Sequence, residues 1–315
     1  MRGIHAILYA LFDAEERLDR ELMRRQVELC VGAGVHGLAA LGLATEVAKL
    51  SEDERFTVME WMAEDNAGRL PMAFTIFGAS VAEQVRQVRK AEDVGASWVI
   101  LQPPMVGSFP ADEYLRFFGR VSESTRLPVA IQNAPAYMGR GLSADDLRVL
   151  TRQHPNIRAL KAEGSAVDIG RLIEVLGDEV PVLNGRSGLE LVDCLGAGCA
   201  GMILAPELID VSLRIYEAVQ AGDRAAAEAD YARMLPAVTF FMQSIETFLC
   251  YGKRLLGLRA GLPVQDRAPC LRPTPLGETI VARFAEQLGP LASRPAPSRR
   301  NPAATLPPSG RGLVR

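Results

Sequence analysis

One segment of this 315-residue chain combines a lysine and a glutamate in a spacing that suits covalent chemistry: Lys161 and Glu163, within Ile157–Gly164. Side chains alternate between the two faces of a strand, so Lys161, Glu163 and Ala159 share one face. An amine in an apolar interior attacks carbonyl carbons and forms an imine (Schiff base), while a neighbouring carboxylate can accept and return protons. Two interpretations are open at this point: a reactive lysine with an acid/base partner, and a structural ion pair.

Short apolar runs bounded by Gly or Pro recur along the chain and predict the strands that must position this pair. Such continuous apolar runs are typical of a parallel sheet with both faces covered. The eight predicted strands are Ile4–Phe12, Gly37–Gly42, Pro71–Phe77, Trp98–Gln102, Pro128–Asn133, Ile157–Lys161, Pro181–Asn184 and Ala200–Leu204. Lys161 therefore stands at the end of the sixth strand.

Segments with helical periodicity lie between these strands. The predicted helices include Ser51–Ala67, Ser80–Val94, Ser143–Gln153 and Gly185–Leu195. Eight strand–helix units in about 220 residues match an α/β fold of the (β/α)8 TIM-barrel type, whose active site lies at the carboxyl ends of the strands. An open doubly wound sheet is the alternative, but it usually has a glycine-rich loop after its first strand, and Phe12–Glu15 is no such loop.

The pattern divides the chain into three regions. We expect the (β/α)8 barrel in residues 1–220 and a C-terminal helical extension in residues 221–292. Ala-rich helical sequence runs through Ala205–Leu258, with Gly222 and Gly252 as predicted breaks. Residues 293–315 are rich in Pro, Ser and Arg and offer little apolar surface to bury, so they are predicted to form a disordered tail.

Composition limits the classes of partner. Hydrophobic residues make up 48% and charged residues 23% of the chain, and the net charge of −3 provides no basic surface for a nucleic acid. No apolar run approaches the roughly 20 residues of a membrane span, and no cleavable signal peptide is recognisable at the N-terminus. The five cysteines have no metal-ligand spacing, so we expect reduced thiols and a cytoplasmic location.

Six stretches, taken in chain order, carry a resemblance to a known family. They are His36–Gly42, Glu46 with Leu50–Arg55, Gln102–Pro104, Gln132–Pro135, Leu160–Lys161 and Gly198–Gly201. Together they resemble the dihydrodipicolinate synthase/N-acetylneuraminate lyase superfamily of class I aldolases and dehydratases, over roughly residues 3–290. This resemblance implies a TIM barrel with C-terminal helices and identifies Lys161 with the family's Schiff-base lysine.

Departures from the family pattern narrow the reaction. The synthase and lyase members move protons through a Thr after the second strand and Tyr residues after the fourth and fifth strands. The matching positions here are Ala44, Val106 and Gln132, none of which can act as an alcohol or phenol. The synthase's carboxylate-binding Arg falls at Tyr137. We therefore do not expect a genuine dihydrodipicolinate synthase.

Another branch of the superfamily, the 2-keto-3-deoxyarabonate dehydratases, resembles this chain more closely at Gln132, Thr45–Glu46 and Lys161–Glu163, although Val47 and Asn133 depart from it. The resemblance implies a hydro-lyase that dehydrates a 2-keto-3-deoxy sugar acid through an imine, with no metal or organic cofactor. Two alternatives stay open. One is a class I aldolase that releases pyruvate, and the other is a barrel that binds a 2-oxo acid without converting it.

Imine chemistry suggests roles for two further polar residues. Glu163 is expected to be the acid/base group, with a salt bridge that only orients Lys161 as the alternative. Gln132 would orient a water molecule or the imine nitrogen, or else make a purely structural hydrogen bond.

Substrate contacts are expected from four further residues. Thr45 would bind the substrate carboxylate, or cap a turn instead. Gly185 would let substrate approach the backbone, and Ile203 matches a position whose backbone carbonyl faces the active site. Arg186 would contact a distal hydroxyl or carboxylate, or else be an ordinary surface arginine. Members of the superfamily are commonly oligomers, so a homodimer or homotetramer is expected.

Overall fold

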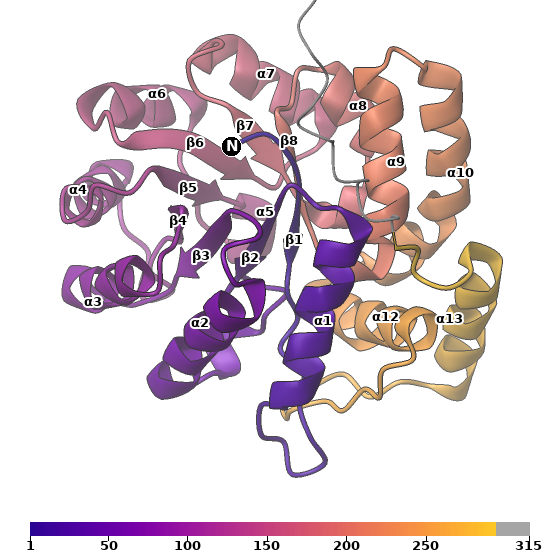
Figure 1. Ribbon diagram of the computed structural model, residues 1–315. Helices are drawn as coiled ribbons and strands as arrows, with labels where there is room; N and C mark the ends of the chain where they lie inside the picture. Colours follow the sequence, from indigo (N-terminus) through magenta and orange to yellow (C-terminus); the bar gives the residue numbers. More distant parts are fainter. Residues whose placement is uncertain (294–315) are drawn as a thin grey trace, which may run out of the picture.

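The computed structural model describes residues 1–293, so the predicted disordered tail at 293–315 lies almost wholly outside the described residues. Eight parallel strands form one closed barrel in chain order, with β8 pairing back to β1 (Figure 1). The strands are β1 (Gly3–Ile7), β2 (Gly37–Ala40), β3 (Met72–Ile76), β4 (Trp98–Leu101), β5 (Val129–Asn133), β6 (Ile157–Ala162), β7 (Val182–Asn184) and β8 (Gly201–Leu204). The predicted TIM barrel is thus confirmed.

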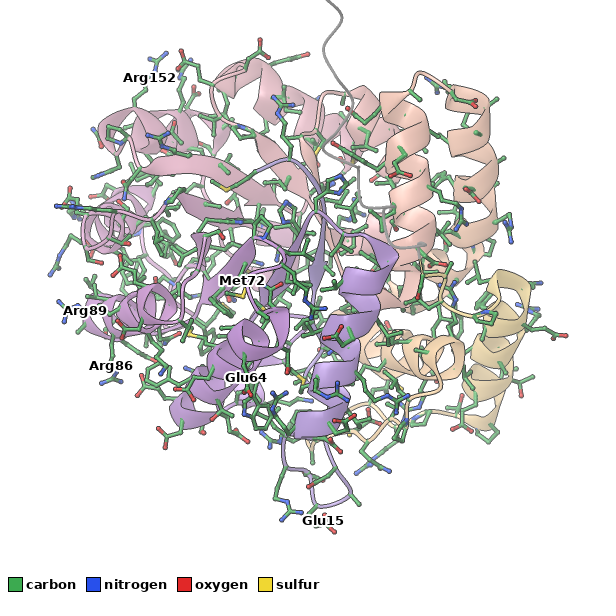
Figure 2. All side chains as sticks on the ribbon, in the orientation of Figure 1. Glu15, Glu64, Met72, Arg86, Arg89 and Arg152 are labelled. Atoms are coloured by element: carbon green, nitrogen blue, oxygen red, sulfur yellow. The ribbon has the colours of Figure 1, made fainter. Side chains whose placement is uncertain are left out.

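Helices surround the barrel on its outer side (Figure 1). They are α1 (Arg20–Ala33), α2 (Glu52–Asn66), α3 (Val81–Asp93), α4 (Ala111–Ser122), α6 (Ala144–Gln153), α7 (Ala166–Leu176), α8 (Leu191–Gly196) and α9 (Ile209–Gln220). The short helix α5 (Pro135–Met138) follows β5 and lies inside this layer, next to the strands. Helix α2 begins with a capping box, in which Ser51 Oγ accepts from the Glu54 backbone N–H and the Glu54 carboxylate accepts from the Ser51 N–H. Arg86, Arg89 and Arg152 point outward on this helical layer (Figure 2).

Further helices follow the barrel. They are α10 (Arg224–Phe241), α11 (Ile245–Thr247), the π-helical turn η4 (Phe248–Gly252), α12 (Lys253–Ala260) and α13 (Pro275–Leu288). Helix α10 packs along α9, and α12 contacts the short helix η3 (Pro206–Leu208) that follows β8. This extension therefore reaches the end of the barrel where the strands finish. Within residues 1–293, no helix combines the length and the hydropathy that a membrane crossing requires.

The first strand is shorter than predicted. It ends at Ile7, whereas the prediction continued to Phe12. Residues 8–12 are fully buried, yet they leave the sheet, and Phe12 makes only an isolated bridge with Leu18. The apolar run therefore reflects a loop packed into the core, which sequence alone does not distinguish from a strand.

Two predictions about helices after the sixth strand were wrong. Gly185–Leu195 is not one helix. Arg186 (φ 56°) and Ser187 (φ 48°) are left-handed inside the short helix η2 (Arg186–Gly188), and Glu190 (φ 60°) is left-handed between η2 and α8. Gly252 does not interrupt the C-terminal helices, since η4 continues directly into α12. A Cβ at position 252 would lie 2.6 Å from Tyr9 Oη, so this glycine makes room for a side chain instead of ending a helix.

Strand register decides which side chains enter the barrel. Ala130 pairs with Ala159, Gln132 pairs with Lys161, and Lys161 pairs with Leu183. Paired residues on neighbouring parallel strands point to the same face. Lys161, Gln132 and the small residues at 130 and 159 therefore share the barrel interior.

Candidate active site

The predicted lysine–glutamate pair stands at the carboxyl end of β6. Lys161 is 2% and Glu163 is 8% exposed, and Lys161 Nζ lies 2.8 Å from Glu163 Oε1. Ala159 precedes them on the same face and leaves room beneath the lysine. The pair is therefore enclosed, charge-matched and directed into the mouth of the barrel.

A glycine stands against each member of this pair. A Cβ at Gly42 would lie 3.7 Å from Lys161 Nζ and only 2.6 Å from Ile7 Cδ1. A Cβ at Gly185 would lie 3.2 Å from Glu163 Oε1. A side chain at either position would therefore contact the pair or its surroundings. The expected role of Gly185, to let substrate approach the backbone, stays a prediction, and Gly42 was not singled out from the sequence.

Lys161 and Glu163 line a pocket of about 400 Å³, including its open mouth. Its polar residues are Tyr137, Arg186 and Ser187. Its apolar residues come from the barrel and from the C-terminal helices: Ile7, Leu43, Ala44, Ile203, Ala205, Met242, Ile245 and Phe248. The extension therefore completes the site, a contribution that no motif in residues 221–292 indicated.

Gln132 is the register partner of Lys161 on β5 and is 1% exposed. In the described part of the chain, neither its amide nitrogen nor its amide oxygen has a hydrogen-bonding partner. Buried amides are normally paired. Gln132 is therefore placed beside the amine with unused hydrogen-bonding capacity, which agrees with the predicted orienting role without testing it.

Thr45 does not point into the pocket. Its hydroxyl donates to the Leu8 carbonyl at 2.6 Å and accepts from the Leu41 backbone N–H at 2.9 Å. This side chain fixes the loop after β2 to the end of β1, so the expected contact with a substrate carboxylate has no support in the geometry. The residues of this loop that line the pocket are Leu43 and Ala44.

Arg186 is a pocket residue and not a surface arginine. Its Nε donates to Tyr137 Oη at 3.2 Å, and its Nη1 donates to the Gly164 carbonyl at 3.0 Å and to Glu190 at 2.8 Å. Tyr137 was noted in the sequence only as the replacement for the family's carboxylate-binding arginine. The structure brings Arg186, from the loop after β7, into contact with this tyrosine.

A buried carboxyl lies behind Ser187. Glu207, in η3, is 1% exposed and accepts a hydrogen bond from Tyr9 Oη at 2.9 Å. Burial raises the pKa of Glu207 to about 7, against the lowering influence of hydrogen bonds from Tyr9 and Ser187 and of the Arg259 charge. No sequence motif pointed to this residue.

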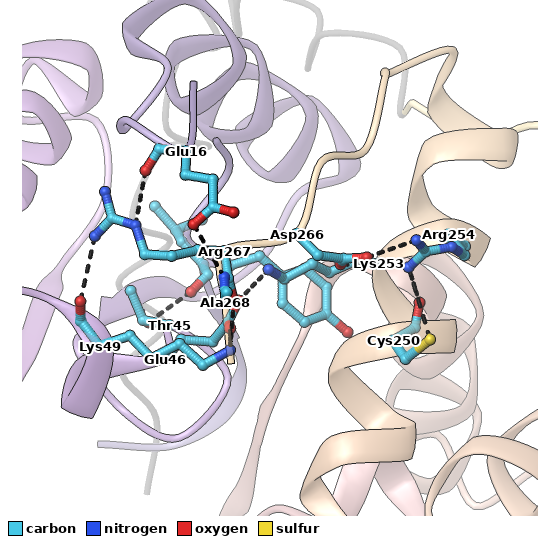
Figure 3. Close-up of polar contacts among 12 residues, drawn as sticks. Glu16, Thr45, Glu46, Lys49, Cys250, Lys253, Arg254, Asp266, Arg267 and Ala268 are labelled. Atoms are coloured by element: carbon cyan, nitrogen blue, oxygen red, sulfur yellow. Dashed lines mark hydrogen bonds and ion pairs between the residues drawn. The ribbon is translucent and has the colours of Figure 1, made fainter. Parts of the chain in front are cut away.

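A second buried lysine lies close to the site without entering it. Lys253, the first residue of α12, is 1% exposed and forms an ion pair with Glu46, in the loop that also carries Leu43 and Ala44 (Figure 3). Glu46 has the left-handed conformation (φ 54°) and also pairs with Lys49 at 2.5 Å. The C-terminal helices are thus ionically connected to a loop of the active site.

Comparisons with known proteins agree with this architecture. An L-2-keto-3-deoxyarabonate dehydratase from Azospirillum brasilense is 28% identical over 302 residues, which cover 93% of this chain and 96% of the relative. A 4-hydroxy-tetrahydrodipicolinate synthase from Methanoculleus marisnigri is 29% identical, with 81% of this chain and 89% of the relative covered.

Solved structures show the same fold. The crystal structure of a candidate dihydrodipicolinate synthetase from Pseudomonas aeruginosa matches with a TM-score of 0.86 and 27% identity, covering 91% of this chain and 99% of the other. The prophage protein YagE from E. coli K12, solved in complex with pyruvate, matches with a TM-score of 0.85 at 23% identity, covering 91% and 98%. A family model described as the dihydrodipicolinate synthetase family matches residues 1–278, and the chain belongs to this family of lyases.

Proposed function

We propose that this protein is a class I lyase that forms a Schiff base on Lys161 and removes water from a 2-keto-3-deoxy sugar acid, such as 2-keto-3-deoxyarabonate. The observation that carries the proposal is the enclosed Lys161–Glu163 pair, 2.8 Å apart, at the bottom of the pocket. Family membership and the relative from Azospirillum brasilense support the reaction class.

The geometry accounts for the first chemical steps. Glu163 can take a proton from the Lys161 ammonium, and the resulting amine attacks the C2 carbonyl of the substrate. Glu163 returns this proton to the hydroxyl group of that adduct, which leaves as water and gives a protonated imine. The protonated imine withdraws electrons and makes the C3 hydrogen acidic. Glu163, on the same face of β6, can then remove the C3 proton.

Borohydride trapping followed by mass spectrometry tests the proposal. Reduction in the presence of 2-keto-3-deoxyarabonate should attach to Lys161 a group with the mass of the substrate-derived imine less one water. A pyruvate-sized group at Lys161 would indicate an aldolase instead. Peptide mapping locates the modified residue.

Two variants make this test specific. Lys161→Arg should abolish labelling, whereas Lys253→Arg, which alters the other buried lysine, should leave it intact. If no 2-oxo acid, pyruvate included, labels the wild-type protein, imine chemistry is excluded and the proposal is wrong.

A further inference from the structure

Dehydration on an imine requires a proton donor for the departing C4 hydroxyl. The family positions that carry hydroxyl relays are Ala44, Val106 and Gln132 in this chain, and none of them can donate in this way. Among the described residues that line the pocket, the hydroxyl groups belong to Tyr137 and Ser187. The candidate proton donors are therefore the hydroxyl groups of these two side chains.

Ser187 is engaged on the inner side of the site. Its side chain is hydrogen-bonded to the carboxyl group of Glu207, which is itself fully buried and bonded to Tyr9. The Ser187 proton is thus directed away from the pocket. Tyr137 differs, because its oxygen accepts a hydrogen bond from Arg186 Nε, and its own O–H proton remains available to a bound substrate.

Local structure fixes both partners of this contact. Tyr137 belongs to the four-residue helix α5, which starts with Pro135 and ends at Gly139 in the left-handed region (φ 64°). Arg186 is fixed on its other side by the Gly164 carbonyl and by Glu190, although its own backbone has the unfavourable φ of 56°. A residue kept in a strained conformation beside a pocket is a candidate for function.

The charge beside Tyr137 suits a phenol that gives up its proton. Burial alone would lower the pKa of Arg186, but the contacts with Tyr137 and Glu190 outweigh it and raise the pKa, so the guanidinium stays charged. Its positive charge lies where negative charge would develop on the Tyr137 oxygen as the proton leaves. Tyr137 and Arg186 also line the same pocket as Glu163.

We propose that Tyr137 is the catalytic acid that protonates the departing C4 hydroxyl, with Arg186 as the residue that positions it and balances its charge. This inference rests on the proposed function. Glu163 takes the C3 proton and the C–H electrons form the enamine. These electrons then form the C3–C4 double bond as the C4–O bond breaks, and the oxygen leaves as water with the Tyr137 proton. Proton return from Glu163 to Tyr137 through that water restores both groups.

A deuterium-exchange experiment separates this step from the earlier ones. With 2-keto-3-deoxyarabonate in D2O, NMR follows deuteration at C3 and formation of the dehydrated product in the same sample. In Tyr137→Phe, deuteration should continue while product formation falls about 100- to 10,000-fold, the range of general acid catalysis. Glu163→Gln should instead lose both signals.

Matched variants exclude a merely structural effect. Tyr114→Phe removes the hydroxyl of a buried tyrosine in α4, outside the pocket of Lys161, and should leave both rates unchanged. Arg186→Lys should retain more product formation than Arg186→Met, because it keeps the charge. Tyr137→Phe should also keep the borohydride-trapped pyruvate adduct at Lys161.

Three outcomes would overturn the assignment. Product formation by Tyr137→Phe within threefold of wild type would show that another group donates the proton. Equal loss of deuteration and dehydration would place Tyr137 before C3 deprotonation. A wild-type protein that deuterates the substrate or forms the adduct but never releases water would refute the dehydratase proposal, and this inference with it.

Discussion

The space around Lys161 and Glu163 depends on two neighbouring glycines, which have no side chains. Gly42 lies against the amine and Gly185 against the carboxylate, and neither position has room for a side chain without loss of the space beside the reactive atoms. An amine that must attack a carbonyl carbon along a defined direction tolerates little displacement of either partner. At this scale, the proposed catalysis depends on the missing side chains of Gly42 and Gly185 as well as on Lys161 and Glu163.

Substitution of Gly42 tests this dependence. In Gly42→Ala, the new Cβ would lie 2.6 Å from Ile7 Cδ1 and 3.7 Å from Lys161 Nζ, so either Ile7 moves or the amine is obstructed. We expect imine formation with pyruvate to slow by about tenfold or more, measured as the rate of borohydride-trapped adduct. Gly196→Ala is the control, because a Cβ there meets no atom within 4 Å. Equal trapping rates in both variants would contradict the argument.

The proximity of Lys161 and Glu163 could be predicted from the sequence, but the orientation of Thr45 could not. Alternation along a strand follows from backbone geometry, so it places Lys161 and Glu163 together without knowledge of the fold. The loop after β2 has no such rule, since Leu41 (φ 66°) and Glu46 (φ 54°) adopt left-handed conformations that their residue types do not signal. These two residues turn the Thr45 hydroxyl toward β1.

At the scale of elements, the C-terminal helices contact the loops at the mouth of the barrel. Lys253 of α12 pairs with Glu46, and Arg267, in the segment after α12, donates to the carbonyls of Glu16 and Lys49 (Figure 3). These contacts connect the extension to the loops after β1 and β2. The extension therefore both covers the pocket and fixes a loop that lines it.

Loss of Lys253 should cost stability. In Lys253→Met, the Glu46 carboxylate keeps only Lys49 as an ionic partner in a buried setting, and breaking a buried ion pair typically costs about 3–5 kcal/mol. Urea unfolding measures this change. The double variant Lys253→Met/Glu46→Gln should recover part of the loss, because it removes the unpaired charge. A double variant with the summed losses of the two single variants would show that the two side chains are not coupled.

Glu207 connects three elements, since it follows β8 and contacts Tyr9 after β1, and its backbone carbonyl accepts from Arg259 of α12. Burial raises its pKa from 4.5 to about 7, so folding favours the protonated form. Its contribution to stability is complete below pH 4.5 and is lost as pH rises through about 7, by roughly 3 kcal/mol.

The pH dependence of the unfolding free energy of the wild type does not isolate the contribution of Glu207, because His5 changes it in the opposite direction. Burial lowers its pKa from 6.5 to about 4, so its contribution is complete above pH 6.5 and is lost as pH falls, opposite to Glu207. Because His5 is present in both wild type and Glu207→Gln, its contribution cancels in the difference between their unfolding free energies. That difference should change by roughly 3 kcal/mol between pH 4.5 and 7, measured by urea unfolding. Parallel curves would show that Glu207 titrates normally.

Elements were predictable where burial and periodicity agree. All eight strands were located because a strand covered on both faces is a short apolar run between turn residues. The failures, at residues 8–12 and at Gly185–Leu195, are segments in which packing and left-handed residues override local pattern. Neither the packing nor the left-handed conformations can be recognised from the residue types of one short stretch.

At the scale of the whole molecule, the closed barrel was predictable from the number of strand–helix units, whereas the closure of the pocket by the C-terminal helices was not. The residues Met242, Ile245 and Phe248 are far from Lys161 in the sequence, yet they line the same pocket. Their contact depends on how α10 packs along α9, which hydrophobic periodicity in α10 does not specify.

The predicted association into a homodimer or homotetramer also concerns the whole molecule. Large apolar side chains are exposed in the loop between β4 and α4: Met105 at 42%, Val106 at 45% and Phe109 at 45%. Contiguous exposed apolar side chains are typical of association surfaces. We expect this loop to lie in a contact between copies of the chain, and sedimentation velocity should show a dimer or larger at micromolar concentration.

Charge substitution locates that contact. Val106→Glu/Phe109→Glu places two like charges in the loop and should shift the protein to monomer, because burying unpaired carboxylates between copies is unfavourable. Leu258→Glu changes another exposed apolar residue, 56% exposed on α12, and should leave the assembly unchanged. A double variant that sediments like the wild type would place the contact elsewhere. A monomeric wild type would mean that the apolar loop serves another role, and assembly would then have no part in forming the site.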